Sequence, residues 1–168
     1  WAEQWDMLAP ASGFYGINLL AAWDSLTNPT TVRVGVIDTG YRPHADFASR
    51  IIPGYDFIGD TLIANDGNGR DSDASDPGDW ITSAENASGY FAGCGASNSS
   101  WHGTHVAGTI GAVANNGIGV AGINQVSKIQ PLRVLGKCGG YTSDIADAIR
   151  WSAGLPVSGV PTNGTPDR

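Results

Sequence analysis

Apolar and polar positions along the chain predict alternating helices and strands. Residues 17–26 place apolar side chains at helical spacing, which indicates a short amphipathic helix that Asn28 and Pro29 end. Residues 32–37 form a nearly continuous apolar run, typical of a strand covered on both faces in a parallel sheet. Asp38 then falls at the carboxyl end of this strand, the edge at which open parallel sheets bind ligands.

A long polar segment separates this strand from the next elements. Residues 59–100 are rich in Gly, Asp, Ser and Asn, and we expect such an insertion to be functional or ordered by metal. Residues 102–114 set apolar side chains at helical intervals among small ones, which predicts a buried helix. Residues 128–135 predict a second strand, in which Pro131 removes a ladder donor and indicates an edge or a bulge.

The last predicted element is a helix that Thr142 or Ser143 caps and Gly154 ends. Its predicted face comprises Ile145, Ala148, Ile149 and Ser152. Prolines then mark residues 154–168 as an exposed loop. Strands alternate with helices at the spacing of βαβ units, without internal repeats, so the pattern predicts an α/β fold.

Composition narrows the class of protein. With 168 residues, 41% of them hydrophobic, the chain can bury a core, so we expect one globular domain or a large piece of one. The net charge of -7 includes only nine lysines and arginines, so we expect no nucleic-acid partner and no membrane-surface partner. The chain starts at Trp1 and lacks an apolar run of about 18 residues, so we expect a processed, soluble product.

Cys94 and Cys138 each lie among glycines. A disulfide, a metal site and idle thiols are the alternatives. Export from the cell would favour the disulfide, which would stabilise the fold by about 4 kcal/mol in the chain-entropy model.

Two motifs carry the chemistry: Val-Ile-Asp-Thr-Gly at residues 36–40 and His-Gly-Thr-His-Val-Ala-Gly at residues 102–108. Together they resemble the subtilisin-like serine peptidase family, in which this aspartate and the first histidine are catalytic. The similarity continues through residues 117–122 and 134–136, and it covers most of residues 32–151. For Asp38 alone, a turn-capping acid is the simpler alternative.

The resemblance implies a subtilisin-like three-layer fold with a mostly parallel central sheet flanked by helices. Residues 1–168 would be the N-terminal part of a single catalytic domain. The family is secreted and hydrolyses peptide bonds with an Asp-His-Ser triad, in which Asp38 would orient the imidazole of His102 and His102 would take the serine proton. The expected substrates are therefore proteins or peptides.

The order Asp, His, Ser along the chain is that of the subtilisin type, so the serine is expected downstream. Its motif does not occur before Arg168. We therefore expect a C-terminal fragment of the same enzyme, carrying the serine, as a partner. Residues 154–168 would form the exposed loop at which the chain is nicked or truncated.

The acidic insertion resembles those of secreted bacterial subtilases that carry extra calcium sites. A hard divalent cation would neutralise its crowded oxygens, and the spacing differs from an EF-hand. The expected ligands are Asp66, Asn68, the Arg70 carbonyl, Asp73 and Asp76. A solvated acidic loop is the alternative.

The resemblance implies a second calcium site between the N-terminal segment, the turn after Asp38 and the loop after the histidine helix. This chain differs from the family in having Ala45 in that turn and one extra residue at 114–116. The ligands would be Gln4, Asp46, Asn116 and the carbonyls of Val113, Ile118 and Val120.

Residues 138–141 correspond to the family strand that pairs with the extended backbone of the substrate. Gly139 and Gly140 would leave room for that backbone, and Tyr141 would border the P4 pocket. A plain glycine turn is the alternative. The family fold would also bring the loops of Cys94 and Cys138 together beside the cleft, which implies a disulfide.

Other polar residues have simpler interpretations. His105 lacks the glutamate and the spacing of a zinc protease, so we expect a packed histidine with a satisfied ring nitrogen. His44 is expected in a turn, and Ser99 or Ser100 as a cap of the histidine helix. The competing functions are a non-catalytic calcium-stabilised relative and, third, a zinc hydrolase.

Overall fold

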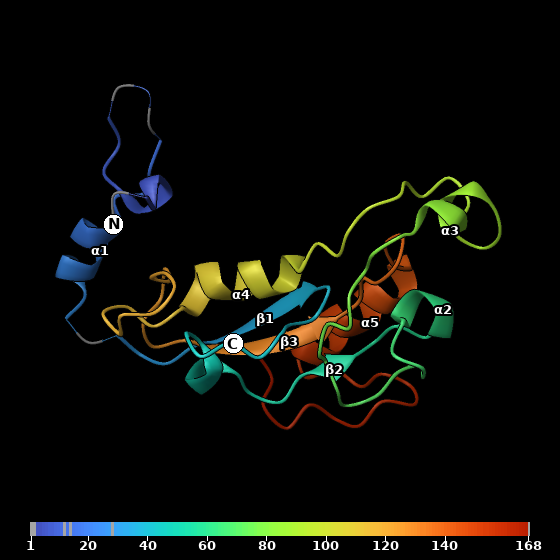
Figure 1. The fold of residues 1–168 in the computed structure, drawn as a ribbon. Coiled ribbons are helices and arrows are strands. Elements are labelled where there is room, and N and C mark those ends of the chain that lie inside the picture. Colours follow the sequence, from blue (N-terminus) through green and yellow to red (C-terminus); the bar gives the residue numbers. More distant parts are fainter. Residues whose placement is uncertain (1–2, 12, 14, 28, 168) are drawn as a thin grey trace.

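The computed structural model describes residues 3–11, 13, 15–27 and 29–167, so the predictions for Trp1, Asn28 and Arg168 lie outside the described residues. Within this part of the chain one parallel sheet is formed in the order β1-β3-β2 (Figure 1). Its strands are β1 (Arg33–Asp38), β2 (Tyr55–Asp56) and β3 (Lys128–Arg133).

The α-helices of the described chain are α1 (Leu19–Ser25), α2 (Thr61–Ala64), α3 (Ser83–Ala87), α4 (His102–Gly111) and α5 (Thr142–Ser152), and 3-10 turns occur at Trp5–Met7 and Ala48–Arg50. The helices confirm the predicted order in part: α4 lies between β1 and β3 and α5 follows β3, whereas β2, α2 and α3 were not predicted. None of the helices is both long and apolar enough to cross a membrane, among the residues described.

Side chains of alternating direction give the sheet two apolar faces. Val36 and Ile129 pack with Ala107 of α4 on one face. Leu132 packs with Trp151 of α5 on the other face. Because each face is covered by one of these helices, the sheet is the middle of three layers, as the family resemblance implied.

The prediction for Pro131 is only half right. The strand that contains it is central rather than an edge. The carbonyls of Ile129 and Arg133 accept hydrogen bonds from Ile52 and Phe57 on the β2 side. The backbone of Pro131 lies between the Ile51–Ile129 bridge and the pairing of β2 with Leu132 and Arg133. Its missing N–H therefore falls where no residue is paired on the β2 side.

Two predicted helix details are wrong. Helix α5 begins after Tyr141, which occupies the N-cap position in place of Thr142 or Ser143. Its buried face includes Trp151, which packs on the aromatic rings beside β2, whereas Ile149 is 54% exposed. The packing of Trp151 against these rings thus determines which face of α5 is buried.

The buried side chain of α1 is Leu19, whereas Ile17 and Leu20, two of the apolar residues at helical spacing, are exposed. The helix begins two residues later than predicted and is short, so its orientation follows the single leucine that packs inward.

The insertion lies beyond the carboxyl ends of the strands, where Figure 1 shows α2 and α3. It has a small apolar core of its own, against which Cys94 packs. The members of this core are Ile58, Ile63, Ala64, Ile81 and Phe91. The insertion is therefore a folded unit, although its apolar residues follow no regular period.

Candidate active site

Asp38 and His102 meet where β1 ends and α4 begins. Nδ1 of His102 lies 2.9 Å and 2.8 Å from the two carboxylate oxygens of Asp38. A carboxylate without a proton only accepts hydrogen bonds, so this contact requires a proton on Nδ1, and in a ring with one proton Nε2 is then the acceptor. Asp38 is 8% exposed, whereas the His102 side chain is 65% exposed. The pair thus combines a buried carboxylate with an exposed imidazole ring.

Gly103 explains how the two motifs approach so closely. A Cβ atom at this position would lie 2.1 Å from the carbonyl oxygen of Gly40 and 3.2 Å from Cβ of Asp38. Only glycine lets the first turn of α4 press on the loop after β1. The Asp-Thr-Gly and His-Gly-Thr sequences therefore form one packing unit.

The first amides of α4 are bound by hydroxyl groups. His102 N donates to Oγ of Ser100 at 3.3 Å, and Gly103 N donates to Oγ1 of Thr39 at 3.0 Å. The N-cap position itself is Trp101, whose indole has no acceptor. Ser99 or Ser100 was expected to cap this helix, but the N-cap residue is Trp101, and Ser100 binds the His102 amide from one position further back. The part played by Thr39 was missed, because sequence spacing does not reveal a contact across 64 residues.

Asp76 and Asp79 of the insertion accept hydrogen bonds from these hydroxyls. Thr39 Oγ1 donates to Asp76 at 2.8 Å, and Ser100 Oγ donates to Asp79 at 2.7 Å. The second carboxylate oxygen of Asp76 accepts the N–H of Gly78, and burial raises the pKa of Asp76. Asp76, expected as a calcium ligand, therefore has both oxygens bound within the protein.

Arginines neutralise other acids of the insertion. Arg133 is 1% exposed and binds Asp66 at 2.7 Å as well as Asp56. Arg70, whose carbonyl is expected to bind calcium, directs its guanidinium to Asp144 and Asp147 of α5, and these contacts do not involve the carbonyl. No group of three or more His, Cys, Asp or Glu side chains suited to a metal ion occurs among the described residues.

The remaining expected ligands of the insertion lie in a run of short turns. Asn68 binds the side chains of Asp66 and Asp71. Asp73 accepts the N–H of Ser75, and the Ser75 hydroxyl together with this N–H lowers the pKa of the Asp73 carboxyl group. These contacts hold the loop by internal hydrogen bonds.

The structure brings together the side chains expected at the second calcium site. Asp46 is 2% exposed and accepts hydrogen bonds from the Asn116 amide at 2.7 Å and from Val120 N at 2.8 Å. The Gln4 side chain binds the backbone N–H and carbonyl of Ala121. Asn116, not Asn115, is thus the asparagine that contacts Asp46.

The second site is built from oxygen atoms, and in the structure both Asp46 carboxylate oxygens and the Gln4 and Asn116 amide oxygens each accept an N–H. A Cβ atom at Gly119 would lie 2.3 Å from a carboxylate oxygen of Asp46, so the loop wraps closely around that group. Beside it is a cavity of about 240 Å³, lined in part by Gln4, Asn116 and Ile118. The donor atoms are carboxylate, amide and carbonyl oxygens, which are the ligands that calcium prefers. Val113 N donates to the Asp46 carbonyl and places the start of the loop.

The predicted substrate strand leads from the end of β3 into α5. Gly139 has a φ of +105°, and a Cβ atom at Gly140 would lie 2.0 Å from the Val134 carbonyl oxygen. Both positions therefore require glycine. Tyr141 is 49% exposed and lies at the edge of a 280 Å³ cavity that Phe91 of the insertion also lines.

Tyr90, which the sequence analysis did not single out, lines the same cavity. Its hydroxyl lies 3.1 Å from the Tyr141 hydroxyl and donates to Asp60 at 2.6 Å. This bond raises the pKa of Tyr90 and lowers that of Asp60. The insertion thus contributes to the wall beside the predicted substrate strand.

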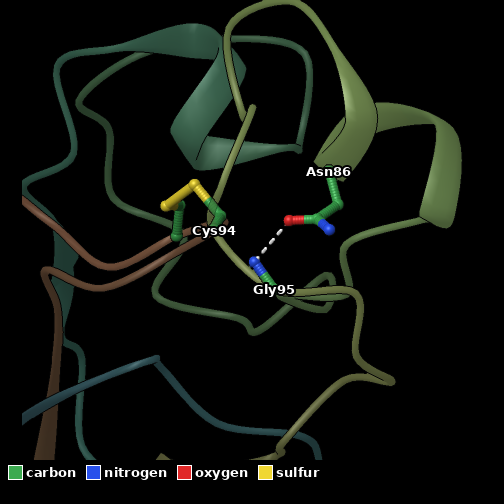
Figure 2. Close-up of a disulfide and its surroundings, with 4 residues drawn as sticks. Asn86, Cys94 and Gly95 are labelled. Atoms are coloured by element: carbon green, nitrogen blue, oxygen red, sulfur yellow. Dashed lines mark hydrogen bonds between the residues drawn. A yellow bond between two sulfur atoms is a disulfide. The ribbon is translucent and has the colours of Figure 1, made fainter.

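Cys94 and Cys138 form a disulfide between the insertion and this strand, with their Cα atoms 5.5 Å apart. Figure 2 shows the bond beside the hydrogen bond from Gly95 N to the Asn86 side chain. The pairing implied by the family resemblance is therefore present in the structure.

Lys137, next to Cys138, strengthens the same connection. Its ammonium group pairs with Glu85 of α3 and lies 5.1 Å from the ring centres of Trp80 and Phe91. The hydrogen bond from Lys137 lowers the pKa of Glu85 from 4.5 to about 2, with help from Thr82.

Of the predictions for the two other histidines, one is wrong and one is confirmed. His105 is exposed, so the expectation of a packed ring is wrong, because its position on α4 points away from the sheet. His44 is an exposed turn residue as predicted, and its Nδ1 accepts the N–H of Asp46 at 3.2 Å.

Comparisons with known proteins agree with this geometry. Over 98% of its length the chain is 55% identical to an "Extracellular protease" of Xanthomonas campestris pv. campestris and 44% identical to an "Extracellular basic protease" of Dichelobacter nodosus. It spans 27% and 26% of those two proteins, about a quarter of their length.

Among solved structures, a protease of Pseudoalteromonas arctica PAMC 21717 is similar with a TM-score of 0.88 and 54% identity. The similarity covers 99% of this chain and 47% of that one. The Subtilase family matches residues 30–164, which include both the Asp38 and the His102 motif. The chain belongs to the Subtilase family.

Proposed function

We propose that this chain forms the N-terminal part of the catalytic domain of an extracellular serine endopeptidase. The observation that carries the proposal is the contact of His102 Nδ1 with both carboxylate oxygens of Asp38, at 2.8 and 2.9 Å. The names of the relatives support both the protease activity and the extracellular location. The substrates would be proteins or peptides.

In this reaction His102 would move the proton. Its Nε2 would accept the proton of a serine hydroxyl while the serine oxygen bonds to the carbonyl carbon of the substrate. Asp38 would stabilise the imidazolium so formed, and Nε2 would then give the proton to the leaving amine. Because only the neutral imidazole can accept, activity should be lost in acid. A C-terminal part of the same enzyme would supply the serine.

The substrate would bind as an extra strand along Gly139 and Gly140. Their lack of side chains leaves room for the extended backbone, whose amides and carbonyls would pair with the strand. Tyr141 would border the pocket for the P4 side chain, next to Tyr90 and Phe91.

Calcium would bind at the site of Asp46. Its ligands would be the Asp46 carboxylate, the Gln4 and Asn116 amide oxygens, and carbonyls of Val113, Ile118 and Val120. The ion would add a fixed positive charge that neutralises the buried carboxylate and joins the N-terminal segment to the loop after α4. The set predicted in the insertion, residues 66–76, remains a prediction that a variant at Asp73 can test.

The activity can be tested by producing residues 1–168 together with the downstream part of the enzyme. We expect hydrolysis of a peptide substrate and labelling by a serine-directed phosphonate. Asp38→Asn should keep the fold and lower turnover by about four orders of magnitude, because the amide favours the wrong tautomer of His102. The matched control is Asp24→Asn, at an exposed acid of α1, which should leave turnover unchanged. Near-normal turnover of Asp38→Asn would contradict the triad and favour a non-catalytic calcium-binding module.

A further inference from the structure

The start of α4 has an unusual set of hydrogen bonds. The first amides of an α-helix lack partners within the helix and are commonly bound by the N-cap side chain. Here the N-cap residue is Trp101, with a φ of +52°, and hydroxyls from elsewhere bind the amides of His102 and Gly103. One hydroxyl belongs to Ser100 and the other to Thr39. The backbone of the catalytic histidine is therefore held from outside its helix.

A carboxylate of the insertion fixes each hydroxyl in turn. The Thr39 hydroxyl donates a hydrogen bond to Asp76 at 2.8 Å, and the Ser100 hydroxyl donates one to Asp79 at 2.7 Å. A hydroxyl whose proton is directed to a carboxylate turns its lone pairs towards the remaining neighbour, which here is the helix amide. The negative charges also lie near the positive end of the helix dipole.

The carboxylates are themselves held on both oxygens. Asp76 accepts Gly78 N on its other oxygen, and its own N–H donates to the Tyr41 carbonyl. Asp79 accepts Ser100 N at 2.6 Å on its other oxygen. Each carboxylate is thus a rigid acceptor, and neither could lose an oxygen without losing one of these bonds.

We propose that Asp76 and Asp79 are positioning residues, which hold His102 against Asp38 through the hydroxyls of Thr39 and Ser100. The left-handed backbone of Trp101 is unfavourable for a side chain of that size and persists only where its surroundings enforce it. Without the two carboxylates the first turn of α4 would relax, and the imidazole would leave the Asp38 carboxylate. This inference rests on the proposed function only in naming peptide hydrolysis as the reaction.

The first test needs no turnover. In the whole enzyme that contains this chain, with labelled histidine, NMR should show one hydrogen-bonded Nδ1–H signal from His102. Asp76→Asn and Asp79→Asn preserve shape but replace one acceptor oxygen by a donor, which then faces another donor. We expect the His102 signal to shift and broaden in both variants and to stay unchanged in Asp24→Asn, the exposed control on α1.

The second test separates positioning from stability. The concentration of competent sites is counted by burst titration with a peptide ester, so that misfolded protein does not enter the rate. Asp76→Asn and Asp79→Asn should each lower kcat by about ten- to a hundredfold, as misplacement of a catalytic group does, with KM within about twofold of the wild type. Thr39→Ser should retain kcat, whereas Thr39→Val should lose as much as Asp76→Asn, because serine keeps the hydroxyl and valine does not.

A double variant tests whether Asp79 acts on His102 through the Ser100 hydroxyl. Asp79→Asn with Ser100→Ala should cost no more than either alone, because both interrupt the same pair of bonds. Should Asp76→Asn prevent folding, this pair decides the question. Unchanged kcat and an unchanged His102 signal in Asp79→Asn and Ser100→Ala would overturn the positioning role. A wild-type enzyme with the bonded His102 signal but no hydrolysis would contradict the proposed function and leave the positioning role standing.

Discussion

At the scale of single residues, the site depends on glycines, because a Cβ atom at these positions would collide with a neighbouring oxygen. Gly103, Gly119 and Gly140 each leave out a Cβ atom that would lie 2.0 to 2.3 Å from a neighbouring oxygen. Those oxygens belong to Gly40, Asp46 and Val134, which lie at the Asp38–His102 pair, the predicted calcium site and the proposed substrate strand. Three glycines far apart in the chain thus permit the three close approaches that the proposed function needs.

Replacement of Gly103 by alanine should separate the catalytic pair. The new methyl group would meet the backbone oxygen of Gly40, which cannot move aside as a side chain could. We expect kcat/KM of the assembled enzyme to fall by about a hundredfold or more, because α4 must shift away from Asp38. Kinetics with a peptide substrate and a crystal structure of the variant would measure the loss and the shift.

Gly108→Ala is the matched control on the same helix. No atom lies within 4 Å of a Cβ built at this position, apart from the neighbouring residues and the backbone of the helix itself. Alanine favours a helix interior by about 1 kcal/mol over glycine, so this variant should be at least as stable as the wild type and equally active. Equal activity of the Gly103 and Gly108 variants would show that close packing at Gly103 is not required.

At the scale of elements, the sequence predicted those parts that local patterns determine. The apolar run before Asp38 and the helical spacing after His102 predicted β1 and α4, whose ends differ from the prediction by a few residues. As the motifs predicted, Asp38 ends the strand and His102 begins the helix. The core of the insertion was not foreseen, since its apolar residues, from Ile58 to Phe91, follow neither period. The partners of Thr39 and Arg133 could not be predicted either, because they come from distant loops.

The disulfide should contribute most of the stability of the insertion. Cys94 and Cys138 are 44 residues apart, and closing such a loop stabilises the folded state by about 4 kcal/mol in the chain-entropy model. Cys94→Ser with Cys138→Ser should lower the free energy of unfolding by about that amount in urea titration. Two reactive thiols in the unfolded, unreduced wild type would instead show that the bond is not formed.

The Glu85–Lys137 pair predicts a dependence of stability on pH. The pKa of Glu85 is about 2 in the folded protein, below its ordinary value of 4.5, because Lys137 and Thr82 stabilise the charged form. Its contribution is therefore fully present above pH 4.5 and is lost as the pH falls towards 2. The difference in melting temperature between wild type and Glu85→Gln should shrink over this range. A difference that stays constant from pH 6 to about 2 would contradict the assignment.

At the scale of the whole molecule, the N-terminal segment is connected to the sheet through the predicted calcium site. Gln4 binds Ala121 on the loop after α4, and that loop encloses Asp46. A ligand that binds only the folded state raises stability with the logarithm of its free concentration. Calcium would therefore act on the connection between segments that are far apart in sequence.

We expect excess chelator to lower the melting temperature of the assembled enzyme and calcium, but not magnesium, to restore it. Asp46→Asn should remove most of this response, because the only carboxylate of the site is lost. Asp73→Ala should weaken a second, separate response if an ion also binds in the insertion. A melting temperature that chelator leaves unchanged would exclude both sites.

The folded core of the insertion should also affect how fast an enzyme that contains this chain is inactivated by autolysis. Peptidases cleave chains that can unfold locally into an extended shape, and long glycine-rich loops beside the cleft are the segments within easiest reach. Here that segment is closed by Cys94–Cys138, by the Glu85 capping box of α3 and by the cluster around Phe91. Cleavage within the insertion would first require the disulfide, the capping box and the apolar cluster to open together, so autolysis should begin elsewhere in the chain. Reduction of the disulfide should make the insertion a site of autolysis.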